Sequence, residues 1–309
     1  MPADISLSRE GENWLRLKMQ HIFWRLISGL PDRPFIRWKY FSMSGRFPDL
    51  DHPRLFTEKV QTRKLYDRNP LYPVMVDKAA AKDLIRERAG QQHVIPTYWV
   101  GRNLADVDWT KIPLPAVVKP THGSGSGVFL RSQQDIKDLM DNNPSKKWLS
   151  VKFHRINREW AYGEFEPLIV IEQMLVDEHD VPDDYRFFIF SKRIAHVEIR
   201  FRRDGIGYEA NYTADWKNTG YTSDYYKPYP LPVPRPQNLE KMIDVATKVA
   251  GDSDFMRVDL YNIGGEIYVG ELTIYPGGGF KGCIPDEYDE HLGALWDQRL
   301  PTMRGTNAS

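Results

Sequence analysis

The sequence predicts an α+β protein built from two lobes, and three observations support this fold class. The chain has 309 residues, which is long enough to bury more than one hydrophobic core. Short apolar runs typical of strands occur along it together with amphipathic stretches typical of helices. Two glycine-rich turns lie next to strands that also carry charged residues. We expect the segments around these two turns to organise the rest of the molecule.

The composition restricts the class of function. Lys plus Arg and Asp plus Glu number 42 each, and this zero net charge argues against a general nucleic-acid binder, which needs a basic field. Cys283 is the single cysteine, so no disulfide can form within the chain, as in a reducing cytoplasm. No apolar run approaches the roughly 20 residues of a membrane-spanning helix. The polar, acidic start of the chain does not resemble a signal peptide.

The N-terminal part of the chain predicts an amphipathic helix from Trp14 to Leu30. Between Trp14 and Tyr40 there is one acid, and three tryptophans are interleaved with six basic residues: Arg16, Lys18, Arg25, Arg33, Arg37 and Lys39. Such a helix either packs on its own domain, which is the commoner arrangement, or lies on an anionic membrane surface. Peripheral membrane contact through residues 14–40 is therefore an alternative.

Two helices and a strand are predicted next. The first helix spans about Thr57 to Tyr66, where Thr57 offers an N-cap. The second spans Val76 to Ala89, because Asp77 is a capping acid, good helix formers follow it, and Gly90 ends the pattern. A short strand runs from Ile95 to Val100.

A glycine-rich loop follows an apolar strand that ends at Lys119-Pro120. Gly123, Gly125 and Gly127 alternate with serines in the segment PAVVKPTHGSGSGVFL, and a second strand follows. Glycines allow backbone N–H groups to turn toward an anion. The loop is not a P-loop, because no Gly-Lys-Ser/Thr follows and the chain returns as a strand. It is either a cover for phosphates or a flexible hairpin tip.

Two further strands each carry a charge of interest. Glu172 lies within the apolar run Leu168 to Leu175, where an acid needs a partner, either a nearby lysine or an adenine amino group. Arg186 lies on the strand Pro182 to Phe190. The other predicted elements are helices at Gln133–Asn142, Asn238–Ala250 and Asp289–Leu300, a strand at Ile194–Arg203, and a long loop at Tyr208–Pro236 of the kind that often covers a site.

A β-hairpin is predicted over Phe255 to Phe280, with Gly264-Gly265 between two strands. Arg257 and Asp259 are two residues apart and leave one face of the first strand, as Glu271 and Thr273 do on the second. A two-residue Ile263-Gly264 turn would put Glu271 on the opposite face from Asp259.

A three-residue loop would instead place Arg257 across from Glu271 and Asp259 diagonal to it. We predict this register because it gathers two carboxylates, a hydroxyl and a guanidinium. Such a face suits Mg²⁺ carrying phosphates. The simpler interpretation is a cross-strand salt bridge on a solvated sheet face.

In this order, the features resemble those of ATP-grasp enzymes: a lysine at a strand end, a glycine hairpin, a strand with one glutamate, a strand with arginine, and a carboxylate hairpin. The chain resembles most closely the TupA-like ATP-grasp family, named after a teichuronopeptide biosynthesis protein. The segments that carry the resemblance are DKAAAKDLIRERAG, VVKPTHGSGSGV, LIVIEQML, PDDYRFFIF and RVDLYNIGGEIYVGELTIYPGG. The resemblance covers the chain from about Tyr40 to Leu300.

The resemblance implies an ATP-grasp fold in which two α+β lobes clamp ATP and Mg²⁺. The implied parts are a helical N-terminal extension (1–72), an N-terminal lobe with the phosphate loop (73–175), a C-terminal lobe with the Mg²⁺-binding hairpin (176–300) and a disordered tail (301–309).

The resemblance also implies roles for individual residues. The phosphate-contacting set is Lys78, Lys119, His122, Gly123, Ser124, Gly125, Ser126 and Gly127, with a plain turn histidine as the alternative for His122. The nucleoside set is Glu172, Gln173 and Leu175 for adenine and Asp180 for ribose, with Asp177 and Glu178 as alternatives. The residues that meet the reacting group or the substrate are Arg186 and Arg257. The Mg²⁺ ligands are Asp259, Glu271 and Thr273, although most of the superfamily has asparagine at the last position.

The implied activity is that of an ATP-dependent carboxylate–amine ligase, which forms an amide through an acyl phosphate. The implied partners are a uronic-acid-containing capsular or cell-wall polysaccharide, or a sugar intermediate, and an amino acid. The expected location is the cytoplasm, with the inner face of the membrane as an alternative. Other interpretations are a kinase that phosphorylates a sugar hydroxyl, a glycosyltransferase that uses the Asp252-Ser253-Asp254 spacing, and a non-catalytic polysaccharide-binding protein.

Overall fold

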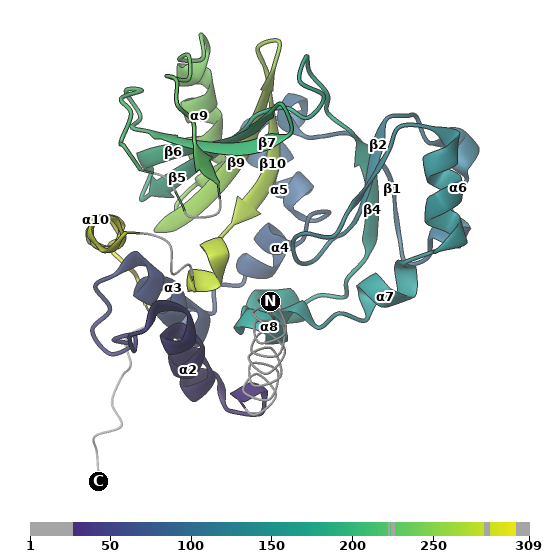
Figure 1. Ribbon diagram of the computed structural model, residues 1–309. Helices are drawn as coiled ribbons and strands as arrows, with labels where there is room; N and C mark the ends of the chain where they lie inside the picture. Colours follow the sequence, from purple (N-terminus) through teal and green to yellow (C-terminus); the bar gives the residue numbers. More distant parts are fainter. Residues whose placement is uncertain (1–26, 222, 224–225, 281–284, 301–309) are drawn as a thin grey trace, which may run out of the picture.

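Two β-sheets, each with its own helices, make up the described part of the chain (Figure 1). The computed structural model describes residues 27–221, 223, 226–280 and 285–300. The smaller sheet uses strands between residues 97 and 173, and the larger sheet uses strands between residues 184 and 273. This arrangement confirms the predicted α+β class.

The smaller sheet is antiparallel, with the strand order β1-β4-β2-β3. Its strands are β1 (Thr97–Gly101), β2 (Ala116–Pro120), β3 (Val128–Leu130) and β4 (Ile169–Gln173). Helix α6 (Gln133–Asp141), which begins with a capping box, packs against it. In the central pair, Val117 lies opposite Glu172, so Lys119 and Glu172 lie diagonally on one face.

The larger sheet has the order β10-β9-β5-β6-β7-β8 and is antiparallel except for the β7–β8 pair. Its strands are β5 (Asp184–Phe190), β6 (Arg193–Arg203), β7 (Ile206–Tyr212), β8 (Lys227–Pro228), β9 (Phe255–Ile263) and β10 (Glu266–Thr273). Helix α9 (Leu239–Ala250) packs against the sheet through its apolar side, and α5 (Ala81–Ala89) packs beside α9. Successive side chains of a strand alternate between the two faces of the sheet. The polar side chains of the central strands therefore gather on one face.

The remaining helices are α2 (Asp32–Ser44), α3 (Phe56–Tyr66), α4 (Tyr72–Val76), α7 (Ser145–Leu149), α8 (Phe153–Asn157) and α10 (Asp286–Leu295). Of these helices, α2, α3 and α10 lie near one end of the larger sheet, and α7 and α8 lie below the smaller one (Figure 1). Short 3₁₀ turns occur at η1 (Gln91–His93), η2 (Leu104–Asp106), η3 (Trp109–Lys111), η4 (Trp160–Gly163) and η5 (Pro276–Gly279). Helix α3 contacts both α10 and η5, the turn that follows β10.

The structure corrects three predicted elements. The helix predicted at Val76–Ala89 is interrupted between α4 and α5, because the Asp77 carboxylate accepts from the backbone N–H of Ala79 and stabilises a turn there. The loop predicted at Tyr208–Pro236 begins within a strand, since β7 pairs with β6 along its whole length. The last helix begins and ends earlier than predicted, at Asp286–Leu295.

Several predictions concern residues that the structure does not describe. The helix predicted from Trp14 lies largely outside the described residues, as do Cys283 and residues 301–309. Among the described residues, no helix has both the length and the apolar character needed to cross a membrane. The boundaries between the four predicted parts of the chain stay predictions.

Candidate active site

The turn between β9 and β10 contains two residues instead of the predicted three. Gly264 and Gly265 form it, both with positive φ (58° and 89°). A β-bulge at Gly270 then inserts one extra residue into β10. Glycine suits the bulge, since a Cβ at this position would lie 2.7 Å from Cε2 of the Tyr261 ring.

The bulge decides which polar side chains meet. A two-residue turn alone would put Glu271 and Asp259 on opposite faces, but with the extra residue they lie directly opposite each other on one face. Thr273 likewise lies opposite Arg257. The predicted pairing of Arg257 across from Glu271, with Asp259 diagonal, is therefore wrong. The predicted gathering of these four side chains on one face is confirmed.

Arg257 holds this polar face together. Its Nε and Nη2 donate to the two carboxylate oxygens of Asp259, at 2.7 and 2.6 Å. Nη2 also donates to Oγ1 of Thr273 at 3.0 Å and lies 3.7 Å from a carboxylate oxygen of Glu271. In this arrangement Thr273 orients Arg257, and its role as a metal ligand stays a prediction.

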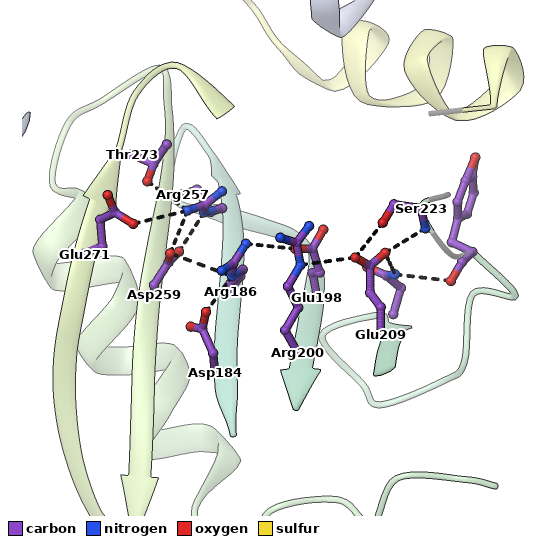
Figure 2. Close-up of polar contacts among 12 residues, drawn as sticks. Asp184, Arg186, Glu198, Arg200, Glu209, Ser223, Arg257, Asp259, Glu271 and Thr273 are labelled. Atoms are coloured by element: carbon purple, nitrogen blue, oxygen red, sulfur yellow. Dashed lines mark hydrogen bonds and ion pairs between the residues drawn. The ribbon is translucent and has the colours of Figure 1, made fainter. Parts of the chain in front are cut away.

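The polar face continues onto β5 (Figure 2). Arg186 donates from Nε to Asp184 at 2.7 Å and lies 3.8 Å from a carboxylate oxygen of Asp259. The predicted common face of Asp184 and Arg186 is therefore confirmed. Arg186 also reaches the next strand, where its Nη1 donates to Glu198 at 3.4 Å.

Sequence reasoning missed the part of this face that lies on β6 and β7. Nε of Arg200 lies 2.7 Å from a carboxylate oxygen of Glu198 and 3.1 Å from one of Glu209. Glu209 also accepts from the backbone N–H and the hydroxyl of Ser223, both at 2.8 Å. We call the whole set the charged row: Asp184, Arg186, Glu198, Arg200, Glu209, Arg257, Asp259 and Glu271. The signal was present in the sequence, because Glu198 and Arg200 alternate with the apolar residues Val197, Ile199 and Phe201.

The two hairpin carboxylates differ in their electrostatic setting. Burial is the largest effect on Asp259 and raises its pKa to about 6, despite the opposing effect of Arg257. Burial acts in the same direction on Glu271, but Lys78, Arg257 and further cations outweigh it, so the pKa of Glu271 is lowered. Glu271 is therefore the carboxylate held more firmly in its ionised form.

A cavity of about 400 Å³ lies between the two sheets and contains most of the predicted nucleotide-binding residues. From the smaller sheet it is lined by Lys119, Gly123, Ser124, Gly125, Ser126, Gly127, Glu172, Gln173 and Leu175. Glu271 lines it from β10, and Tyr261 and Gly270 line it beside Glu271. Lys78 lines it as well and donates through Nζ to the carbonyl of Gly123, at the start of the glycine loop.

Glu172 is buried between two lysines. One carboxylate oxygen pairs with Lys119, and the other accepts from Nζ of Lys82 at 2.7 Å. Burial acts to raise the pKa of Glu172, but the two lysines outweigh it and lower the pKa overall. Lys82, which sequence reasoning missed, lies on α5 four residues after Lys78 and is also bonded to Thr97. The adenine-binding role of Glu172 stays a prediction.

The structure does not bring every predicted residue to the cavity. His122 is buried, and its Nε2 lies 3.0 Å from the carbonyl oxygen of Val151, as expected for a turn histidine. Asp180 is exposed and pairs with Arg131 at 2.6 Å. Asp177 and Glu178, the alternatives for ribose, do not line the cavity either.

The hairpin carboxylates fit a Mg²⁺ ion that arrives with a nucleotide. Within the described residues, no group of three His, Cys, Asp or Glu side chains is arranged to hold a metal ion alone. Mg²⁺ bound to phosphates needs only one or two protein carboxylates. Asp259 and Glu271 supply such a pair on adjacent strands. Since Arg257 bonds both oxygens of Asp259, it has to release at least one for the metal.

Two lobes with a glycine loop, two lysines and a carboxylate hairpin around one cavity define an ATP-grasp protein. The family model of the TupA-like ATP-grasp proteins matches residues 58–297, and the chain belongs to that family. Membership confirms the predicted family and the ATP-grasp fold. The individual roles of the site residues stay predictions.

Two of the solved structures that resemble this chain are ligases. D-alanine–D-alanine ligase from Bacillus anthracis shares 16% identity over 65% of this chain and 57% of its own, with a TM-score of 0.43. L-amino acid ligase from Bacillus licheniformis shares 13% identity over 76% of this chain and 47% of its own, with a TM-score of 0.42. The chain thus spans about half the length of these proteins, and at such identities and TM-scores they indicate nothing about its substrates. No curated protein sequence matches the chain.

Proposed function

We propose that this chain is an ATP-dependent carboxylate–amine ligase that forms an amide through an acyl phosphate. The cavity of about 400 Å³ carries the proposal, because it brings Lys78, Lys119 and the glycine loop opposite Glu271 of the other sheet. Lysines and backbone N–H groups suit the oxygens of a triphosphate, and a carboxylate suits its metal ion. A binding protein for neutral sugars would not need this combination.

In this proposal the protein positions the reactants and neutralises charge, as is general for phosphoryl transfer. Lys78 and Lys119 hold the phosphates, and the glycine loop covers them. Asp259 and Glu271 would hold Mg²⁺, which when bound supplies charge neutralisation at the phosphate oxygens. Arg186 and Arg257 orient the carboxylate that is phosphorylated and stabilise the charge that develops on it.

We further propose that the carboxylate is a uronic acid of a capsular or cell-wall polysaccharide, or of a sugar intermediate, and that the amine belongs to an amino acid. Membership in the TupA-like family supports this substrate class. Because the reaction consumes ATP, we propose that it occurs in the cytoplasm. Membrane contact through residues 14–40 stays a prediction.

The two alternative enzymes, a sugar kinase and a glycosyltransferase, would use different residues of this structure. A sugar kinase would use the same nucleotide cavity, so the product alone separates it from a ligase. A glycosyltransferase is disfavoured, because Asp254 is buried and accepts from the indole N–H of Trp296 at 3.0 Å, and Asp252 pairs with Lys192 at 2.8 Å. The buried and bonded Asp254 is therefore not available to the metal ion of a nucleotide sugar.

The test is ADP release from MgATP with uronic-acid oligosaccharides and a panel of amino acids, followed by mass spectrometry of the products. We expect ADP that depends on both partners and a product heavier by one amino acid less water. A product heavier by one phosphoryl group would identify a kinase. Absence of ADP under every pairing would contradict the proposal.

A further inference from the structure

We propose that a second, smaller cavity beside the charged row binds the primary amine that the ligase joins to the activated carboxylate. This inference rests on the proposed function and assigns the amine its site. The cavity has a volume of about 40 Å³ and lies between the larger sheet, the turn after β10 and α10. Its floor includes Glu198 and Glu209, and its walls include Tyr221 and Tyr288.

The position of this cavity suits the second substrate. Arg257 lines it, and the same side chain lies 3.7 Å from Glu271, which lines the nucleotide cavity. The two cavities are therefore separated by the Arg257 side chain on one face of β9 and β10. A ligand in the small cavity lies next to the place where the carboxylate would be activated.

The chemistry of the lining favours an amine over an acid. Glu198 and Glu209 are almost completely buried, with 5% and 1% of their surfaces exposed, and they share the single guanidinium of Arg200 between them. Two buried carboxylates for one shared cation disfavour a further carboxylate or phosphate in the cavity. Arg257 cannot readily offset them, because Asp259 already holds it through two hydrogen bonds.

The size of the cavity limits what enters it. A water molecule needs roughly 10–15 Å³ on the same measure of volume, so about 40 Å³ holds an amino group and its first carbon atom. A sugar ring does not fit. The cavity therefore receives the amino end of a ligand, and the rest of the ligand stays outside.

One side chain in the wall lacks a partner that such a ligand would supply. The hydroxyl of Tyr288 is buried and has no hydrogen-bond partner among the described residues. A buried hydroxyl without a partner destabilises the free protein. An amine in the cavity would donate to this oxygen and remove that destabilisation.

The experiment compares two probes by calorimetry on the full chain with a non-hydrolysable ATP analogue and Mg²⁺. Glycinamide carries a primary amine without a carboxylate, and N-acetylglycine carries the carboxylate without a free amine. We expect glycinamide to bind and N-acetylglycine not to bind. Tyr288→Phe should weaken glycinamide about tenfold, the effect of one lost hydrogen bond, and should raise the melting temperature of the free protein.

Tyr275→Phe is the matched control. Its hydroxyl is also buried without a partner among the described residues, but Tyr275 lines neither cavity. This variant should raise the melting temperature and leave glycinamide binding unchanged. Preferential binding of N-acetylglycine, no binding of either probe, or wild-type affinity in Tyr288→Phe would each overturn the proposal. Loss of nucleotide-analogue binding alone would instead contradict the proposed function.

Discussion

At the scale of single residues, Glu172 shows what a charge in an apolar strand can predict. Its sequence context correctly predicted a buried acid that needs a partner, with a nearby lysine as one alternative. The structure supplies two lysines, Lys119 and Lys82, and Lys82 is 90 residues away and reaches the carboxylate from α5. A charged residue inside an apolar run therefore indicates that a partner is needed, but it does not identify that partner.

Glu271→Gln tests the metal-binding role of the hairpin. The substitution keeps the shape of the side chain but removes the charge that Lys78 and Arg257 stabilise. We expect ATP turnover to fall about a hundredfold or more, because neutralisation by a bound metal contributes several kcal/mol to phosphoryl transfer. Steady-state ADP release measures the effect, and circular dichroism shows whether the fold survives.

Glu266→Gln is the control for this variant, since Glu266 is an exposed carboxylate at the start of the same strand. It should turn over ATP at the wild-type rate. Wild-type turnover by Glu271→Gln would remove Glu271 from the metal site.

At the scale of elements, the sequence predicts which strands exist but not how they align. The runs that became β4, β5, β9 and β10 were recognisable from their apolar and alternating patterns. The register of the hairpin was not, because it depends on a bulge at Gly270 that accommodates the Tyr261 ring from the neighbouring strand. The part of the charged row on β6 and β7 was missed for a related reason, since it requires the lateral order of β5, β6 and β7.

Gly270→Ala tests the role of the bulge. The new Cβ would lie 2.7 Å from the Tyr261 ring, so the backbone of β10 has to shift and carry Glu271 with it. We expect a loss of about 1–3 kcal/mol in the free energy of unfolding and weaker binding of MgATP. Urea denaturation and nucleotide titration measure the two effects.

Gly29→Ala serves as the comparison, because a Cβ at Gly29 meets no atom within 4 Å and its φ is not positive. It should change neither stability nor binding. If Gly270→Ala behaves like Gly29→Ala, the bulge is not what positions Glu271.

At the scale of the whole molecule, the segment before residue 72 is tied into the larger sheet. Arg63 on α3 is fully buried and donates to the carbonyl oxygens of Phe255 at 3.0 Å and Ile274 at 3.3 Å. It also pairs with Asp254, and its guanidinium carbon lies 4.4 Å from the centre of the Trp296 ring. One side chain thus joins α3, the strand β9 and the segment after α10.

Arg63→Met should therefore destabilise the molecule as a whole. The substitution keeps most of the apolar contact but leaves the buried Asp254 carboxylate without its guanidinium partner, which typically costs about 3–5 kcal/mol. Adding Asp254→Asn should recover part of the loss, because the remaining buried group is then neutral. Arg37→Met on the exposed side of α2 should change the free energy of unfolding by less than about 0.5 kcal/mol. Urea denaturation of the four proteins, wild type included, measures these differences. A stable Arg63→Met, or a double variant no more stable than the single one, would show that α3 is held by its apolar contacts instead.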